Sequence, residues 1–419
     1  KKAEQQGEVR GGASSFEQLV ELGRTNRQFD ANDQHIVSIV DWLWQYAFEQ
    51  RASDIHIEPR RELGIVRFRI DGVLHQVYQI PMSVLNAMTS RIKILGRMDV
   101  VEKRRPQDGR IKTRTADGQE IELRLSTLPT AFGEKLVMRV FDPEVLVRDF
   151  ADLGFTDDDK ARWAQMTGQP NGIILVTGPT GSGKTTTLYS TLKQLATPEV
   201  NVCTIEDPIE MIEASFNQVQ VQQNIDMTFA AGVRALMRQD PDIVMVGEIR
   251  DLETADIAIK AAQTGHMVMS TLHTNDAPST LVRLDNMGVA PFNIASSVIL
   301  ITAQRLARRL CTCKQPADLS TEALLAAGFA ESDLDGSWMP YKAVGCERCK
   351  GSGYKGRLGI YQVMPITETM QDMILKHATA LDIGREAQRN GVRDLRQSGL
   401  LKVKQGMTSL EEVLGCTNE

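Results

Sequence analysis

The residues with the clearest chemical pattern form a glycine loop at residues 178–185, with the sequence Gly-Pro-Thr-Gly-Ser-Gly-Lys-Thr. It follows an apolar run at residues 173–177 and precedes a segment compatible with a helix. Glycines let the backbone fold around an anion, and the N–H groups of the loop and of the next helix point toward it. Lys184 is expected to reach the β- and γ-phosphates, and Thr185 to hold Mg²⁺. The pattern therefore predicts a site for a nucleoside triphosphate. The residues expected around the phosphates are Gly178, Pro179, Thr180, Gly181, Ser182, Gly183, Lys184, Thr185 and Thr186.

A second buried strand ends next to an acid. Residues 242–251 have the sequence Asp-Ile-Val-Met-Val-Gly-Glu-Ile-Arg-Asp. The acid that usually closes such a strand is here replaced by Gly247, and the carboxylate comes one residue later as Glu248. Glycine leaves room for Mg²⁺ and its waters, and a glutamate at this edge suits the positioning of an attacking water. We therefore expect Glu248 to be catalytic.

Two further segments place polar groups near the ends of strands. Glu206 and Glu210 lie around Pro208, which stops a strand and leaves acids at the carboxyl edge of a sheet, where ligands of α/β proteins bind. A solvated acidic turn would have the same pattern. His266 and His273 bracket one apolar strand. A neutral histidine can donate to a phosphate oxygen, so we expect one of the two to face the nucleotide.

Four of the six cysteines form two close pairs, Cys311 with Cys313 and Cys346 with Cys349. Four thiolates match tetrahedral Zn²⁺, and glycines flank the second pair. The first pair is one residue shorter than the usual spacing, so a metal-free loop with buried thiols remains an alternative. Cys203 lies in an apolar run and is expected in the core.

Composition excludes several classes of protein. A net charge of −6 over 419 residues gives no general case for nucleic-acid binding. No apolar stretch approaches the roughly 20 residues that cross a bilayer, and the first residues lack the apolar segment of a signal peptide. We expect a cytoplasmic protein that reaches a membrane only through partners. Because the sequence does not begin with Met, we also expect it to be truncated.

The alternation of apolar residues predicts two regions. The first has helices at 33–50 and 83–98 and strands at 54–58, 64–70 and 73–80, with three more strands within 111–142. It indicates a compact α+β domain. From about residue 149, strands at 173–177, 201–205, 243–246 and 267–271 alternate with helical stretches, which is typical of a doubly wound α/β sheet. Beyond Arg305 the regular order loosens, and residues 366–415 are helical by pattern.

Together these segments resemble those of a known family. Residues 178–185, 204–210, 247–251 and 265–276 occur in the order and spacing found in the type II secretion and type IV pilus assembly ATPases. Residues 51–58 and 104–110 are similar to parts of the family's second N-terminal domain. The resemblance covers about residues 35 to 415.

The resemblance implies a fold and an activity. It implies a linker at 1–30, a PAS-like domain at 31–148 and a RecA-like ATPase domain at 149–419. The last would include a Cys-rich segment at 306–362 and C-terminal helices at 366–415. Six subunits would form a ring with ATP between the two domains. The implied function is a cytoplasmic ATP-hydrolysing motor that powers pilin or pseudopilin assembly through an inner-membrane platform protein. The family's first N-terminal domain, often its docking module, would be missing.

The resemblance also implies roles for individual residues. Lys184 and Thr185 would bind phosphate and Mg²⁺, Glu248 would be the catalytic glutamate, and Glu206 and Glu210 would complete an acidic box. His266 would sense the γ-phosphate. Arg124 and Arg139 would reach the nucleotide from the N-terminal domain. An arginine on a separate domain couples hydrolysis to domain closure.

Three alternatives stay open. A pilus-retraction ATPase is a relative, although retraction relatives generally lack the paired cysteines. A RecA-like nucleic-acid translocase is disfavoured by the acidic chain, and DNA-stimulated hydrolysis would support it. A nucleotide-binding scaffold without turnover is disfavoured because Lys184, Glu248 and both arginines are present.

Overall fold

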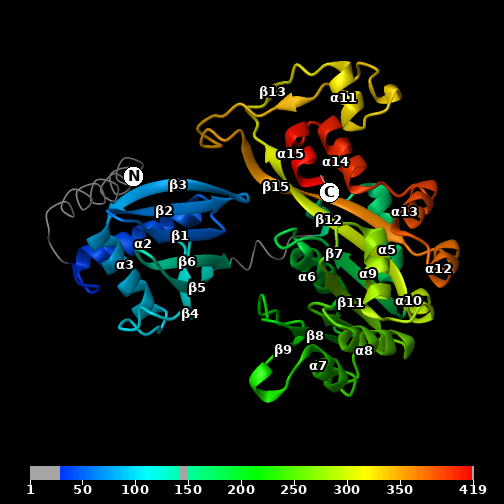
Figure 1. Ribbon diagram of the computed structural model, residues 1–419, viewed down its shortest axis with the longest axis horizontal. Coiled ribbons are helices and arrows are strands. Elements are labelled where there is room, and N and C mark those ends of the chain that lie inside the picture. Colours follow the sequence, from blue (N-terminus) through cyan, green and yellow to red (C-terminus); the bar gives the residue numbers. More distant parts are fainter. Residues whose placement is uncertain (1–28, 142–149, 418–419) are drawn as a thin grey trace. The chain divides into compact units, whose positions relative to one another are not determined.

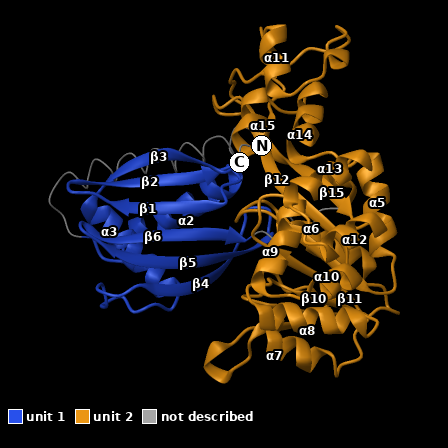
Figure 2. Ribbon diagram, turned by 45° about the vertical axis from the view of Figure 1, so that its right-hand side comes forward, with its two compact units in different colours: residues 1–143 blue, residues 144–419 orange. Residues whose placement is uncertain are grey.

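The computed structural model describes residues 29–141 and 150–417, and the chain divides into two compact units. Unit 1 comprises residues 1–143 and unit 2 residues 144–419 (Figure 2). The linker expected at residues 1–30 lies outside the described residues except for its last two. The domain border expected at 148/149 falls in the segment 142–149, which also lies outside them.

Unit 1 is a six-stranded antiparallel sheet packed against two helices, with the strand order β3-β2-β1-β6-β5-β4 (Figure 1). The predicted elements are confirmed, except that the second helix ends at Leu95 rather than at residue 98 and the first of the three later strands begins at Gln107 rather than near residue 111. Alternate residues of the strands, such as Ile55 and Leu123, are buried with Ile36 and Leu43 of the first helix. The elements are α2 (Gln34–Glu49), β1 (Asp54–Pro59), β2 (Leu63–Ile70), β3 (Val73–Pro81), α3 (Met82–Leu95), β4 (Gln107–Arg114), β5 (Glu120–Thr130) and β6 (Gly133–Phe141).

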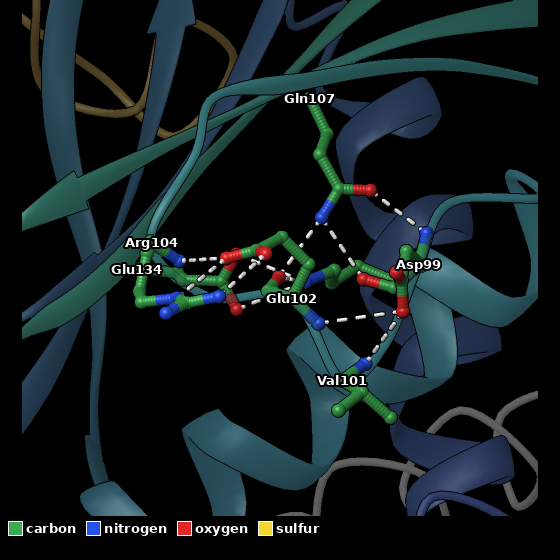
Figure 3. A network of polar contacts seen from close by, with 7 residues as sticks. Asp99, Val101, Glu102, Arg104, Gln107 and Glu134 are labelled. Carbon is green, nitrogen blue, oxygen red and sulfur yellow. Dashed lines mark hydrogen bonds and ion pairs between the residues drawn. The ribbon is translucent and has the colours of Figure 1, made fainter.

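The segment between α3 and β4 is fixed by polar contacts (Figure 3). Lys93 is buried, and its Nζ donates to Glu134 at 2.9 Å and to the carbonyl oxygen of Glu102 at 2.8 Å. A buried ammonium is costly unless it is paired in this way. The Gln107 amide donates to the carbonyl oxygens of Asp99 and Glu102 and accepts from the Asp99 N–H at 2.7 Å. These contacts fix the backbone course of the segment.

Unit 2 contains a seven-stranded sheet with the order β15-β12-β7-β11-β10-β8-β9. Neighbouring strands are parallel except for β15, which is antiparallel to β12. The predicted α/β fold class is confirmed. Its strands are β7 (Gly172–Thr177), β8 (Val202–Glu206), β9 (Asn217–Gln220), β10 (Ile243–Val246), β11 (Met267–Leu272), β12 (Val298–Leu310) and β15 (Tyr354–Pro365). Its first helices are η1 (Phe150–Leu153), α5 (Asp157–Thr167), α6 (Lys184–Leu195), η2 (Gln223–Ile225), α7 (Phe229–Leu236), α8 (Leu252–Gln263), α9 (Ala277–Met287) and α10 (Pro291–Ser297).

Both faces of this sheet are packed. Alternate residues of β7 enter two different apolar clusters: Ile173 and Leu175 pack with residues of α8 and α9, and Ile174 and Val176 with residues of α5 and α6. Strands covered on both faces are apolar at successive positions. This explains why β7 and β11 are buried at every residue.

The end of the chain adds helices to the same unit. The predicted helical region at 366–415 is confirmed as four helices, α12 (Glu368–Leu375), α13 (Ala380–Arg389), α14 (Leu395–Lys404) and α15 (Leu410–Thr417). The cysteine-bearing excursion contains β13 (Gln315–Pro316), α11 (Thr321–Ala327), η3 (Glu331–Asp333) and β14 (Tyr341–Lys342).

The expectation of loosened order beyond Arg305 is wrong. Strand β12 continues to Leu310, and β15 begins at Tyr354, so the excursion between them is narrower than the predicted 306–362. The physical reason is pairing with a strand distant in sequence: β12 is hydrogen-bonded to β7 only as far as Ala303, and to β15 as far as Leu310. The ladder with β15 holds the second half of β12, although this half contains several arginines.

Candidate active site

The chemistry-bearing segments meet at the carboxyl edge of the parallel strands in unit 2. Strands β7, β11, β10 and β8 are consecutive neighbours in the sheet. The glycine loop follows β7 and His273 follows β11. Gly247 and then Glu248 follow β10, and Glu206 is the last residue of β8. Parallel strands end at a common edge, where ligands of open α/β sheets bind. Segments far apart in the sequence are therefore neighbours in space.

The glycine loop has the backbone expected of an anion site. Gly181 and Gly183 have φ angles of +79° and +86°, which side chains rarely adopt, and Gly183 is the N-cap of α6. At Gly178 an added Cβ would lie 2.7 Å from the carbonyl oxygen of Gln304. Helix α6 begins at Lys184, so Thr185 lies in its first turn. The loop and the helix N-terminus together present backbone N–H groups and positive partial charge.

The side chain of Lys184 lies between the glycine loop and His273, the residue that follows β11. Its Nζ donates to the carbonyl oxygen of Gly178 at 2.7 Å and lies 2.9 Å from His273 Nδ1. Burial lowers the pKa of Lys184 to about 8, and the nearby charge of Glu248 opposes that shift. The lysine is thus a partly desolvated cation at the mouth of the loop.

Glu248 is held by two basic groups. Its Oε1 lies 3.0 Å from His273 Nε2, and its Oε2 accepts from Arg250 Nε at 2.8 Å. The carboxylate side chain is only 17% exposed. Lys184, His273 and Glu248 therefore form one chain of contacts, in which the two ring nitrogens of the histidine join the loop to the acid.

The assignment of His266 to the γ-phosphate requires correction. His266 precedes β11, its carbonyl accepts from the N–H of Gly172 at the start of β7, and its Nδ1 lies 2.9 Å from the carbonyl oxygen of Ala261. Six strand residues separate it from the carboxyl edge. At about 3.3 Å per residue this is roughly 20 Å. His273 occupies the place beside Lys184 that His266 was expected to take.

Glu206 is directed into the interior. It is buried and accepts hydrogen bonds from Tyr189 Oη, from Thr204 Oγ1 at 2.8 Å and from Gln218 Nε2 at 3.2 Å. Burial raises the pKa of Glu206 above its usual range, although these hydrogen bonds oppose the shift. Because Tyr189 belongs to α6, the carboxylate links β8 to the helix that follows the glycine loop. Glu210 lies after the strand and is half-buried.

The two predicted arginines of unit 1 lie in one row across its sheet. Arg124 is the cross-strand partner of Arg139, which is also the partner of Asp54, and Arg110 is the partner of Arg124. Directly opposed residues of antiparallel strands project from the same face. Arg139 Nε donates to Asp54 at 3.1 Å, and the Arg124 guanidinium stacks 3.9 Å from the ring centroid of Phe141. The row makes this face of unit 1 rich in positive charge.

The four paired cysteines converge. Their Sγ atoms all lie within 4.8 Å of one another. Cys311 is 3.7 Å from Cys346, and Cys313 is 3.8 Å from Cys349. A tetrahedral ion with bonds of about 2.3 Å to sulfur requires S···S distances of about 3.8 Å. The two pairs interleave, so the short spacing of the first pair does not prevent convergence.

Backbone N–H groups support the same cluster. Cys349 Sγ accepts from the N–H groups of Cys346 at 3.0 Å and of Gly353 at 3.2 Å. A hydrogen bond from the Cys349 backbone lowers the pKa of the Cys346 thiol to about 6, whereas burial and the three neighbouring cysteines raise the pKa of the Cys313 thiol to about 11. Since metals bind the thiolate form, this donor set fits Zn²⁺.

Several residues that contact the candidate site were not predicted from the sequence. Gln304 of β12 donates to the carbonyl oxygen of Ser182 in the glycine loop. The guanidinium of the next residue, Arg305, donates to the carbonyl oxygen of Asn275 at 2.6 Å. Arg250 and Tyr189 were also missed. Gln304 could have been noticed as an amide that directly follows the largely apolar run at residues 298–303.

Among the residues that the structure describes, no helix is both long and apolar enough to cross a membrane.

Comparisons with known proteins identify the family of this chain. A family model described as "Type II/IV secretion system protein" matches residues 30–415. The type IV pilus assembly ATPase TfpB of Acinetobacter baylyi is 58% identical over 399 residues, 95% of this chain and 68% of that protein. The type II secretion system protein E of Aeromonas hydrophila is 43% identical over 401 residues, 95% of this chain and 79% of that protein. The crystal structure of the Legionella pneumophila ATPase DotB has a TM-score of 0.67 at 20% identity, covers 92% of this chain and 95% of that one, and shows the fold alone. The chain therefore belongs to the type II/IV secretion system protein family, as its motifs predicted, and is an ATPase of that family.

Proposed function

We propose that this chain is the motor subunit that powers pilin assembly in a type IV pilus. The main observation that supports this proposal is the chain of contacts from Lys184 through His273 to Glu248 beside the glycine loop. The relative named for pilus assembly is 58% identical and the one named for type II secretion 43%, which favours pilin over pseudopilin as the substrate.

The proposed chemistry assigns a role to each group at the sheet edge. The loop N–H groups and Lys184 bind the triphosphate, and Thr185 holds the Mg²⁺ that neutralises charge on the β- and γ-phosphates. Glu248 positions the attacking water. When the nucleotide binds, His273 turns the Nε2–H that contacts Glu248 toward the γ-phosphate, and Arg250 keeps Glu248 oriented through their 2.8 Å contact. Glu206 acts from the interior by fixing α6.

The proposal extends to the whole assembly. Unit 2 would be the RecA-like ATPase domain and unit 1 the PAS-like domain, which brings Arg124 and Arg139 to the nucleotide. Six subunits would form a ring on an inner-membrane platform protein at the cytoplasmic face, without contacting nucleic acid directly. If the arginines that stabilise the transition state lie on one domain and the glycine loop lies on the other, hydrolysis requires the two domains to close. Hydrolysis is then coupled to domain motion.

The cysteine cluster is proposed as a zinc site formed by Cys311, Cys313, Cys346 and Cys349. Its support is the match of S···S distances and the N–H···S hydrogen bonds. Zinc would join the end of β12 to the start of β15. Metal analysis of the purified protein should give one zinc per chain, which Cys349→Ser should lose; a metal-free wild type would contradict the assignment.

Two substitutions test the proposed catalytic site. Glu248→Gln should bind ATP as tightly as the wild type but hydrolyse it about 10³-fold more slowly, because the carboxylate acts on the water and not on binding. Lys184→Ala should instead lose ATP binding. Unchanged turnover in Glu248→Gln, measured as phosphate release, would exclude the role given to this residue.

A further inference from the structure

Gln304 is a buried amide that joins β12 to both sides of the junction between the glycine loop and α6. Its side chain is 1% exposed. Nε2 donates to the carbonyl oxygen of Ser182 at 2.6 Å, and Oε1 accepts from Thr187 Oγ1 at 2.8 Å. Ser182 precedes the N-cap of α6, and Thr187 lies in its first turns. One side chain from a neighbouring strand therefore uses both its donor and its acceptor on this junction.

The backbone of the same residue shapes the loop. A Cβ added at Gly178 would lie 2.7 Å from the Gln304 carbonyl oxygen, and one added at Gly183 would lie 3.0 Å from Gln304 Nε2. Gln304 is paired with Tyr361 of β15, and the residue before it is paired with Thr177 of β7, so the backbone of β12 is held at this point. Gly178 is thus required by the close approach of the Gln304 backbone, and Gly183 by its own φ of +86° beside the Gln304 side chain.

The direction of the Ser182 carbonyl has a consequence for the ligand side of the loop. A trans peptide is planar, and its C=O and N–H groups point in opposite directions. Holding the carbonyl oxygen of Ser182 toward Gln304 therefore directs the N–H of Gly183 away from β12. In an anion-binding loop, that N–H is one of the donors that must be oriented before the anion arrives.

We propose that Gln304 is a positioning residue of the nucleotide site, which orients the Ser182–Gly183 peptide so that the Gly183 N–H faces the triphosphate. This inference rests on the proposed function of the glycine loop. Gln304 does not contact the nucleotide itself. Its loss leaves the buried Ser182 carbonyl oxygen without this donor, whereas the Thr187 hydroxyl still has the carbonyl oxygen of Gly183 at 3.2 Å. The Ser182–Gly183 peptide can then rotate.

The test compares two changes at Gln304 with a matched change on the same strand. Gln304→Met keeps the length of the side chain and removes both polar atoms. Gln304→Glu keeps the acceptor for Thr187 and, when its carboxyl group is ionised, removes the donor to Ser182. The control is Thr302→Val, which lies two residues earlier on β12, is fully buried, and removes a hydroxyl without a hydrogen-bond partner among the described residues.

Binding of ATP to the full chain, melting temperature without nucleotide, and the KM and kcat of hydrolysis are measured for each variant. Both Gln304 variants should raise the Kd for ATP about tenfold, the cost of about one lost buried hydrogen bond, and should raise KM more than they lower kcat. Thr302→Val should bind ATP as the wild type does. A lower melting temperature with an unchanged Kd in either Gln304 variant would show a purely structural role and overturn the proposal.

Lys184→Ala separates this inference from the proposed function. If Lys184→Ala binds ATP like the wild type, the glycine loop is not the nucleotide site and both fail. If Lys184→Ala loses binding while Gln304→Met and Gln304→Glu bind within about twofold of Thr302→Val, only the role of Gln304 fails.

Discussion

His273 lies between the two groups of opposite charge that a triphosphate site needs. Its Nδ1 is 2.9 Å from Lys184 Nζ and its Nε2 is 3.0 Å from Glu248 Oε1. An ammonium only donates, so Nδ1 accepts and the Nε2–H donates to the carboxylate. A single imidazole therefore connects the residue proposed to bind phosphate with the one proposed to position water.

His273 and His266 form a natural matched pair for mutation. His273→Ala should lower kcat about 100-fold, a typical cost for one polar group at a transition state. His266→Ala should leave kcat within about twofold, because it lies at the opposite edge of the sheet and contacts the carbonyl oxygen of Ala261. Steady-state ATP hydrolysis measures both. Equal losses in the two variants would contradict the placement of His273 in the site.

The pKa of Lys184 predicts how ATP affinity depends on pH. Burial lowers this pKa to about 8 in the free protein, whereas a bound triphosphate would hold the ammonium charged. Binding should therefore take up a proton above pH 8, and the Kd should rise up to about tenfold per pH unit there while staying flat below it.

Titration calorimetry at pH 7.0 and 9.0, in buffers of different ionisation heat, measures this uptake. Lys193→Met is the control, because Lys193 lies on the same helix but is half exposed and paired with Glu213. It should keep the wild-type profile. Equal affinity at the two pH values, without proton uptake at pH 9.0, would show that Lys184 is not the group that titrates.

At the scale of elements, strands with apolar runs or strict alternation could be predicted from the sequence, and β12 and β15 could not. The second half of β12 contains Gln304, Arg305 and Arg308. Their side chains form hydrogen bonds with the glycine loop, with the backbone of Asn275 and with Glu412, respectively. Such partners are distant in sequence, so no local pattern reveals them. In contrast, the sequence was sufficient to decide which of His266 and His273 lies at the site. The rule that ligands bind at the carboxyl ends of parallel strands was sufficient to select His273.

Arg139 is proposed to act in the transition state, and the antiparallel register of unit 1 places it opposite Asp54 and Arg124. Its Nε donates to Asp54 on the neighbouring strand, which orients the guanidinium on the charged face. Arg139→Ala should lower kcat about 10³-fold and change ATP affinity much less, as expected for a cation that stabilises the transferred phosphoryl group. Arg114→Ala is the control, since Arg114 is exposed at the edge strand and pairs with Glu120. A loss confined to affinity in Arg139→Ala would contradict this role.

At the scale of the whole molecule, the proposed site needs groups from two units. The glycine loop, His273 and Glu248 belong to unit 2, and the arginine row belongs to unit 1. A chain that closes its own site would hydrolyse ATP at a rate per subunit independent of protein concentration. A ring that completes each site through its neighbours would not, because dissociated subunits lack the geometry for turnover.

The concentration dependence of turnover therefore tests the ring. The ATPase rate per subunit should rise with protein concentration and reach a plateau once the ring has formed. Mixing Glu248→Gln subunits into the wild type should then lower activity more steeply than the fraction of wild-type chains, because each inactive subunit also stops the motion of its neighbours. Sedimentation of the same mixtures must show that the variant enters the ring. A flat rate per subunit, with activity that falls in proportion to the wild-type fraction, would identify independent subunits and exclude a cooperative motor.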